Sequence, residues 1–183
     1  QGSGVYFKQR LVPFGEYVPL ERWLRGMIAF FDLPMSSFSW GPVNQQPLRA
    51  GQLSLAPFVC YEIVYPDLVA NDARHADIIL TVSNDSWFGR SIGPHQHFEI
   101  ARMRALENGR YLIRGTNNGI SGLVDHRGEV LQTAPQFTAT VLRGEVVPMQ
   151  GITPFGRWGN LPVLALALLS MLPSVPGRGP KTS

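Results

Sequence analysis

The sequence holds a single cysteine, Cys60, among 183 residues, so an internal disulfide is excluded. The thiol is then either a buried small apolar group or a chemically used one. Charged residues are also scarce, at 16% against roughly 25% in an average soluble domain, so we expect part of the surface to face something other than water. With a formal net charge of only +3 and no run of Lys and Arg, the sequence gives no indication of a nucleic-acid groove.

An initiator Met is missing, and residues 1–6 show neither the charged segment nor the apolar run of a targeting peptide. We therefore expect the chain to be part of something longer. There is no internal repeat, and a hydrophobic content of 44% is enough for the core of one domain of ordinary size. We divide the chain into a catalytic domain over residues 1–150 and a linker, apolar helix and basic tail over residues 151–183.

The apolar run over residues 158–172 is shorter than the about 20 residues of a membrane-spanning helix. Pro162 and Pro173 bracket it, so a buried C-terminal helix is the alternative. Trp158 at one edge and two cations beyond the other, Arg178 and Lys181, match interfacial anchoring. The pattern favours a transmembrane helix.

Hydrophobic periodicity predicts an α/β (α+β) fold that mixes parallel and hairpin strands. Apolar runs predict strands over residues 54–59, 78–82, 111–114, 120–124 and 129–132, and helical spacing predicts helices over residues 67–74 and 97–109, with a polar loop over residues 83–94. Within the second helix we expect Phe98, Ala101, Ala105 and Leu106 to form the apolar face.

Cys60 directly follows the first of these strands, which places it at the strand's carboxyl end. Such a junction presents a side chain at the rim of a sheet, where free backbone N–H groups can bind an oxyanion. An inert buried thiol is the alternative, but the ionisable residues Tyr61 and Glu62 follow at once, where continued burial would be costly. Activation of the thiol requires a base or a nearby cation.

Lys8 is the candidate cation, since apolar residues flank it before a turn that contains Glu16. Glu16 is placed to orient Lys8 or a substrate amine. Taken alone, both residues are more often solvated surface charges.

Residues 84–88 follow a strand, and their two aromatics among small polar groups suit the mouth of a pocket for an amphipathic substrate. Trp87 and Phe88 alternatively cap the core. A zinc site on His95 and His97, or on the separate His75 and His126, has neither the helical spacing nor the accompanying Cys or carboxylate ligands. There is no G-x-S-x-G motif, so Ser83 and Ser86 are interpreted as turn residues.

Three motifs in order carry a resemblance to a known family: YFKQRLVPFGEYVP, then CYE at residues 60–62, then SNDSWFGRSIGPHQHFEIARMRALENGRYLIRGTNNGISGLVDHRGEV. They closely resemble the catalytic half of the apolipoprotein N-acyltransferase family, within the nitrilase (carbon-nitrogen hydrolase) superfamily. The resemblance covers nearly the whole chain and implies an α-β-β-α sandwich with a Glu-Lys-Cys triad.

Carried over by motif, the resemblance implies that Cys60 is the nucleophile and Lys8 the triad lysine. It also implies that Glu16 is an additional carboxylate near the site and that Tyr61 and Glu62 are neighbours of the nucleophile. The triad glutamate lies upstream of the lysine motif in the family, and none of the seven residues before Lys8 is acidic. We therefore expect this chain to be inactive alone.

The resemblance further implies acyl transfer from a phospholipid, through a thioester, to the N-terminal amine of an apolipoprotein's diacylglyceryl cysteine, with no cofactor or metal. The cations beyond the apolar run put the C-terminus in the cytoplasm and the catalytic domain on the periplasmic side of a bacterial inner membrane. Two alternatives stay open. One is a soluble nitrilase-type amidase acting on a small amide, and the other is a membrane-anchored binding domain with an inert Cys60.

Overall fold

The computed structural model describes residues 2–13, 15–17 and 38–171, and the seven strands among them form one mixed sheet. The strands are β1 (Gly2–Ser3), β2 (Leu48–Ala50), β3 (Leu53–Val59), β4 (Ile78–Asn84), β5 (Tyr111–Asn117), β6 (Gly122–Val124) and β7 (Val130–Thr133). The helices are η1 (Cys60–Val64), α2 (Pro66–Ala73), η2 (Ser86–Phe88), α3 (Gly93–Asn108), α4 (Pro154–Trp158) and α5 (Leu161–Ser170).

The three central strands are parallel, and antiparallel strands flank them on both sides. β4 pairs with β3 and with β5 in parallel, while β1, β2, β6 and β7 are antiparallel to their neighbours. The predicted mixture of parallel and hairpin strands is confirmed. Because β3, β4 and β5 run in the same direction, their carboxyl ends, with Cys60 next to one of them, meet at one edge of the sheet.

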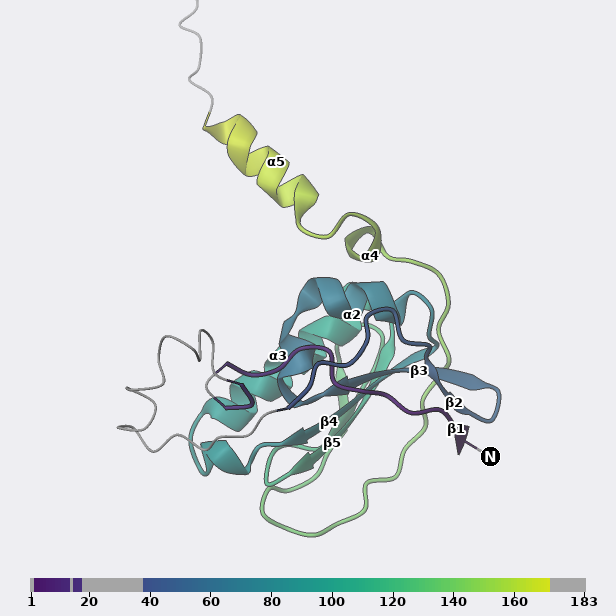
Figure 1. The fold of residues 1–183 in the computed structure, drawn as a ribbon, viewed down its shortest axis with the longest axis vertical. Helices are drawn as coiled ribbons and strands as arrows, with labels where there is room; N and C mark the ends of the chain where they lie inside the picture. Colours follow the sequence, from purple (N-terminus) through teal and green to yellow (C-terminus); the bar gives the residue numbers. More distant parts are fainter. Residues whose placement is uncertain (1, 14, 18–37, 172–183) are drawn as a thin grey trace, which may run out of the picture.

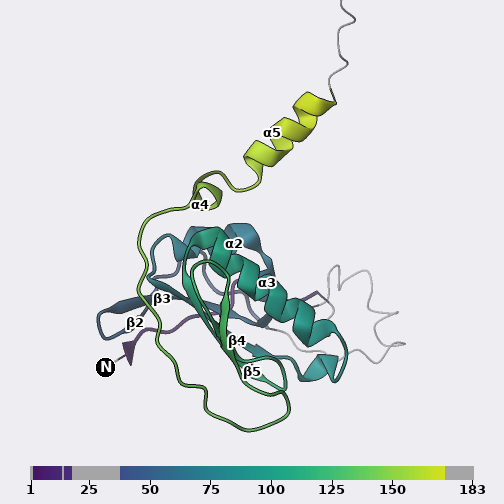
Figure 2. The ribbon, with the colours of Figure 1, turned by 180° about the vertical axis from the view of Figure 1, so that it is seen from behind.

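α2 connects β3 to β4 and α3 connects β4 to β5, and both helices lie over the same face of the sheet (Figures 1 and 2). Pro66 and Pro94 occupy the first turns, where a missing N–H is tolerated. Gly109 ends α3 with a φ of 59°, and its N–H donates to the carbonyl oxygens of Ala105 and Leu106.

The core lies between this sheet face and the two helices. Alternate strand residues, Ala56 and Phe58 in β3, Ile79 in β4 and Leu112 in β5, point into it. β6 adds Val124, and the helices and the adjoining segments contribute Ile63, Val69, Ala73, Ala76, Phe98, Ala101 and Ala105. Leu106 was predicted to join them but is 47% exposed.

The opposite sheet face is only partly covered. A cavity of about 620 Å³ lies there, lined by β4 and β5 residues such as Leu80, Val82 and Ile113 and by the segment over residues 134–142. The described residues therefore form one sheet and one helical layer. The second sheet and second helical layer of the predicted α-β-β-α sandwich are not among them.

The predicted elements are present, with shifted ends. α3 begins at Gly93 instead of residue 97, so the predicted loop over residues 83–94 is wrong at both ends. β4 and β5 run two and three residues further than predicted because their ladder continues through polar pairs, Ser83 with Thr116 and Asn84 with Asn117. The two- and three-residue strands β1 and β2 were not predicted.

The C-terminal part leaves the domain as an isolated apolar helix. α5 extends away from the sheet in Figures 1 and 2, and none of its residues is buried. A buried C-terminal helix is therefore wrong for the described residues. Among those residues no helix has the length and apolarity to cross a membrane, so the predicted span is not confirmed. Arg178 and Lys181 lie outside the described residues.

Candidate active site

Cys60 begins η1 directly after β3, which confirms its predicted position at a strand's carboxyl end. Its φ of 57° is in the left-handed region, which costs a residue with a side chain about 1–2 kcal/mol. The thiol side chain is half-buried. A sharp strand-to-helix turn of this kind exposes a nucleophile at the rim of a sheet.

Glu62, two residues on, is fully buried and ties the turn to the N-terminal segment. Its carboxylate accepts hydrogen bonds from the backbone N–H groups of Val59 at 2.7 Å, Gln9 at 2.5 Å and Arg10 at 3.0 Å. It also accepts from the Tyr6 hydroxyl at 3.2 Å. Burial and then the charge of Glu62 raise the pKa of Tyr6, so the hydroxyl stays a donor. Residues more than 50 positions apart are thus joined at the nucleophile.

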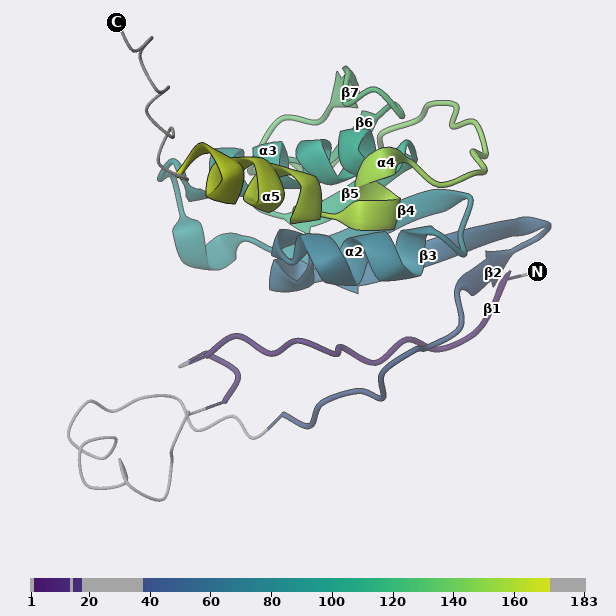
Figure 3. The ribbon, with the colours of Figure 1, turned by 90° about the horizontal axis from the view of Figure 1, so that it is seen from above.

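Lys8 lies in this tethered segment and is paired with Glu16. The ammonium nitrogen is 2.6 Å from both carboxylate oxygens, and the side chains are only 13% and 25% exposed. Glu16 also accepts from the Val12 N–H at 2.9 Å. The segment before β2 runs alongside, where the Gly41 N–H donates to the Lys8 carbonyl oxygen at 2.7 Å (Figure 3). Neither Lys8 nor Glu16 is a solvated surface charge.

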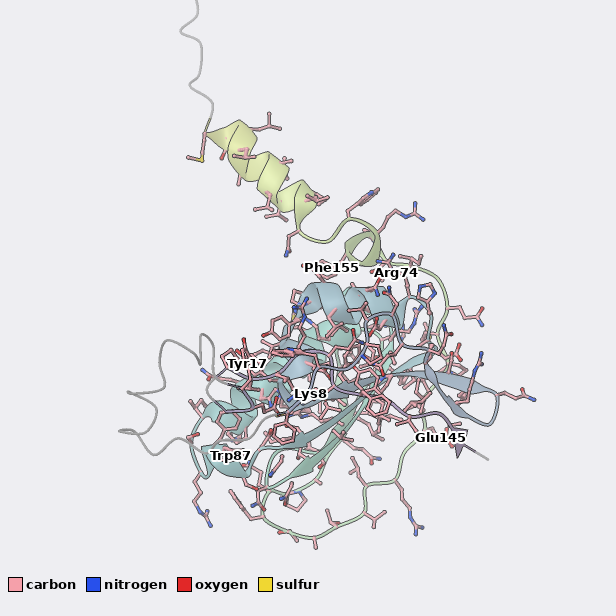
Figure 4. The ribbon with its side chains drawn as sticks, in the orientation of Figure 1. Lys8, Tyr17, Arg74, Trp87, Glu145 and Phe155 are labelled. Atoms are coloured by element: carbon pink, nitrogen blue, oxygen red, sulfur yellow. The ribbon has the colours of Figure 1, made fainter. Side chains whose placement is uncertain are left out.

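Among the described residues, Glu62 bonds neighbours of both groups, namely Gln9 and Arg10 after Lys8 and Val59 before Cys60. No hydrogen bond there joins the side chains of Lys8 and Cys60. Figure 4 shows Lys8 and Trp87 towards one end of the sheet, with Arg74 and Phe155 beside the helices.

A buried ionic network lies behind Cys60, and the sequence interpretation missed it. Asp85, at the end of β4, is fully buried and accepts from Ser83 Oγ at 2.6 Å and from Arg114 at 2.9 Å. Its Oδ1 is 3.0 Å from Nδ1 of His97 in α3. The other ring nitrogen, Nε2, is 3.3 Å from the backbone carbonyl oxygen of Cys60. The network thus joins the carboxyl end of β4, β5 and α3, and His97 connects it to the nucleophile turn.

Opposing effects set the protonation of this network. Burial acts to raise the pKa of Asp85, but the hydrogen bonds from His97 and Ser83 and the charge of Arg114 outweigh it and hold that pKa below its usual range. Burial lowers the pKa of Arg114. The Asp85 carboxylate, and the negative charge that a Cys60 thiolate carries, act in the opposite direction and raise that pKa. Asp85 is therefore a carboxylate at neutral pH.

Asp85 does not line a pocket mouth, which corrects the prediction for that residue. Trp87 is 83% exposed and Phe88 is 41% exposed, so Trp87 does not cap the core. The Phe88 ring packs edge-on against the His97 ring, with 6.4 Å between the ring centroids. Tyr61 is 40% exposed and forms a T-shaped pair with Tyr65, with 5.9 Å between the ring centroids. Partly exposed aromatics thus lie in η1 and directly after it, and Phe88 of η2 contacts the histidine behind it.

No group of three or more His, Cys, Asp or Glu residues in the described part of the chain could hold a metal ion. His97, considered only as a zinc ligand, faces a carboxylate and a carbonyl instead. A sequence signal did exist, because His97, Ala101 and Ala105 recur at four-residue spacing and are all buried on one helix face. A histidine on such a face requires polar partners, which the sequence does not identify.

Comparison with known proteins identifies related sequences along the chain. A family model described as carbon-nitrogen hydrolase matches residues 1–151. The chain is 54% identical over 178 residues to an apolipoprotein N-acyltransferase from Pseudomonas paraeruginosa, covering 97% of this chain and 35% of that protein. It is 57% identical over 169 residues to one from Azotobacter vinelandii, covering 92% and 33%. The chain thus spans about a third of the length of these relatives.

Among solved structures, the C. elegans NitFhit protein matches with a TM-score of 0.53 at 19% identity, over 72% of this chain and 31% of that one. At this identity the likeness concerns the fold alone. It agrees with the nitrilase-like α/β arrangement of the mixed sheet and its helices.

Proposed function

The chain belongs to the carbon-nitrogen hydrolase family, and from that premise we propose that it is the catalytic part of an enzyme transferring a fatty acyl group from a phospholipid to an apolipoprotein. The acceptor is the N-terminal amine of the diacylglyceryl cysteine. The names of the relatives at 51–57% identity support this assignment. The activity belongs to a protein of the relatives' length, of which this chain spans about a third.

The observation that carries the proposal is the tethering of the Lys8 segment to the Cys60 turn by Glu62. A buried carboxylate accepts hydrogen bonds from both segments, which supports a site in which the half-buried thiol and the shielded ammonium act together. Such pre-organisation is what covalent catalysis by a thiol requires.

In the first step, Cys60 Sγ attacks the ester carbonyl carbon of the phospholipid, and an S–C bond forms. The ammonium of Lys8 and the backbone N–H of Tyr61, in the first turn of η1, stabilise the tetrahedral oxyanion. Collapse breaks the C–O bond, and the lysophospholipid alkoxide takes the proton that left the thiol. Cys60 then carries the acyl group as a thioester.

The proton needs a base, which we assign to the triad glutamate that the family resemblance implies, in the part of the relatives that this chain does not span. Glu16 is already bound to Lys8 and Val12, and Glu62 to four donors. The hydrogen bonds of the described residues do not include one to the Cys60 thiol. The described chain alone is accordingly expected to be inactive.

In the second step, the amine of the lipoprotein attacks the thioester carbonyl. A C–N bond forms, the C–S bond breaks, and the amine proton returns through the base to Cys60. A thioester suits this step because it reacts readily with an amine, yet it persists where water is excluded.

The exposed α5 supports a site at a lipid surface. Its leucines and valine are 56–69% exposed on a helix that packs on nothing in the described structure. We assign the protein to the bacterial inner membrane with the catalytic domain facing the periplasm.

The experiment is intact-mass analysis of the protein extended to its relatives' length, after incubation with diacyl phospholipid and no acceptor. A mass gain of one fatty acyl group, absent in Cys60→Ala and reversed by hydroxylamine, is the expected result. A folded, lipid-embedded protein that gains no acyl group refutes the proposal. The same assay with short amides then tests the amidase alternative, which the relatives' names and the exposed α5 support less.

A further inference from the structure

We propose that His97 is held as a doubly protonated imidazolium between Asp85 and the backbone carbonyl of Cys60, and thereby places a buried positive charge behind the nucleophile. His97 is in this view a positioning residue with an electrostatic effect. The inference rests on the proposed function only for its consequence in acyl transfer.

The identity of the two ring partners carries the argument. Nδ1 faces Oδ1 of Asp85 at 3.0 Å, and Nε2 faces the Cys60 carbonyl oxygen at 3.3 Å. A carboxylate and a carbonyl accept hydrogen bonds and do not donate them. A neutral imidazole has one donor and one acceptor nitrogen, so one of its lone pairs would face an oxygen lone pair. Only the imidazolium satisfies both contacts.

Asp85 meets the condition that this arrangement imposes, because it is ionised. A protonated Asp85 would donate to Nδ1 and allow a neutral ring. Its two oxygens instead accept from Ser83 Oγ and from the Arg114 guanidinium, so both favour the carboxylate. The ring is 5% exposed and Asp85 is 0% exposed, so water does not replace either partner.

The charges that face His97 come from each surrounding element. Asp85 directly follows β4, and Arg114 lies in β5. Cys60 lies in η1, and the uncharged Phe88 ring of η2 packs against the imidazole. Two cations and one carboxylate leave a single net positive charge. Glu62, which is also in η1, is occupied by the backbone N–H groups of Gln9, Arg10 and Val59.

Arg114 supports the same polarity. Two of its buried nitrogens, Nε and Nη1, have no hydrogen-bond partner among the described residues. Its guanidinium is close enough to Cys60 for a thiolate to favour the charged form of Arg114. A thiolate, or the oxyanion formed on acylation, is the kind of negative group that a surplus of buried cations stabilises.

The first test is nuclear magnetic resonance of the protein at the relatives' length, with ring-15N histidine and His97→Gln for assignment. We expect both ring nitrogens of His97 to resonate as protonated N–H groups at neutral pH. A pyridine-type nitrogen on His97 overturns the inference.

The second test separates charge from shape. Gln at position 97 can donate to the Cys60 carbonyl without a charge, whereas His95→Gln changes an exposed histidine on the same helix. We expect His97→Gln to retain its melting behaviour and lose at least roughly tenfold in the rate of Cys60 alkylation by iodoacetamide, with His95→Gln unchanged. Full rescue of the rate by Gln would mean that His97 acts only through its shape.

Alkylation needs no phospholipid, so the two proposals fail separately. A wild-type protein that is not acylated but whose alkylation still drops in His97→Gln refutes the acyl-transfer function alone. In an acylating protein, the same substitution should lower kcat roughly tenfold with little change in KM, because the phospholipid does not bind to His97.

Discussion

At the residue scale, the site depends on a few buried polar side chains that each hold several partners. Cys60 adopts a left-handed backbone conformation, which a residue with a Cβ atom disfavours for steric reasons, so its surroundings must impose this conformation. Glu62 fixes the turn from one side through the Val59 N–H, and His97 contacts the carbonyl oxygen from the other. The sequence placed Cys60 correctly from the strand before it. The partners come from distant elements, and no local pattern specifies them.

Glu62→Gln should reduce the free energy of unfolding by about 2–3 kcal/mol. The amide removes the charge and turns an NH₂ group towards the backbone N–H groups that the carboxylate now accepts. Glu99→Gln is the control. Glu99 is 56% exposed, and Arg102 is its side-chain partner among the described residues, so roughly 0.5 kcal/mol or less is expected. Chemical denaturation measures both, and equal losses would contradict the anchoring by Glu62.

Gly119→Ala should destabilise the protein by about 2 kcal/mol or more. A Cβ at Gly119 would overlap Oδ2 of Asp85, which is fully buried and held by Arg114. Gly115→Ala is the matched control in β5, since a Cβ there meets no atom within 4 Å. Thermal melting distinguishes them. If both variants melt alike, Asp85 is not held as rigidly as the contacts indicate.

At the element scale, strong hydrophobic periodicity predicted the positions of β3, β4, β5, α2 and α3, and failed at their polar ends. The ladder between β4 and β5 continues to Asn84 and Asn117 because backbone pairing, not apolarity, decides a strand's length. α3 starts early because Pro94 fits its first turn. Those unpredicted extensions form the edge at which the candidate site lies.

The starts of β3 and β4 are linked by Asp77, which accepts from the N–H and hydroxyl of Ser54 at 2.8 and 2.7 Å. These bonds hold the pKa of Asp77 below its usual value, so their stabilisation is present above the unfolded pKa and lost as the pH falls through the folded one. The free energy of unfolding of the wild type should exceed that of Asp77→Asn by about 1 kcal/mol at pH 7, and the difference should shrink in acid. Denaturation at several pH values checks this, and a constant difference would contradict it.

Arg110 attaches the segment before α4 to the domain. Its Nε donates to the Ala76 carbonyl at 2.8 Å and its Nη2 to the Gly151 carbonyl at 2.7 Å. Arg110→Lys keeps the charge but cannot bridge both carbonyl oxygens, so we expect the free energy of unfolding to fall by about 2 kcal/mol. We also expect faster hydrogen exchange at the Met149 N–H, which donates to the backbone carbonyl oxygen of Asp77 in the same region. The exposed Arg143→Lys should change neither. Unchanged exchange at Met149 in Arg110→Lys would argue against this attachment.

At the scale of the whole molecule, the described chain has two surfaces without a covering layer: the partly open sheet face and α5. The cavity on that face is lined by residues of β4 and β5 together with the segment over residues 134–142. The sequence predicted the strands but not which face stays open, because alternation alone does not identify what covers each side. A four-layer sandwich would place a second sheet against it.

α5 gives the last prediction, because its exposed apolar residues should bind lipid directly. Leu164 and Leu168 lie on one face, 56% and 68% exposed, and each Lys in a bilayer costs roughly 2.5–3.5 kcal/mol. Leu164→Lys with Leu168→Lys should therefore reduce co-sedimentation of the 183-residue chain with phospholipid vesicles by roughly tenfold or more while leaving the circular dichroism of the domain unchanged. Val141→Lys, 78% exposed outside α5, is the control and should bind as wild type does. Equal co-sedimentation of all three proteins would show that α5 does not contact the membrane and would remove the structural support for a lipid-surface site.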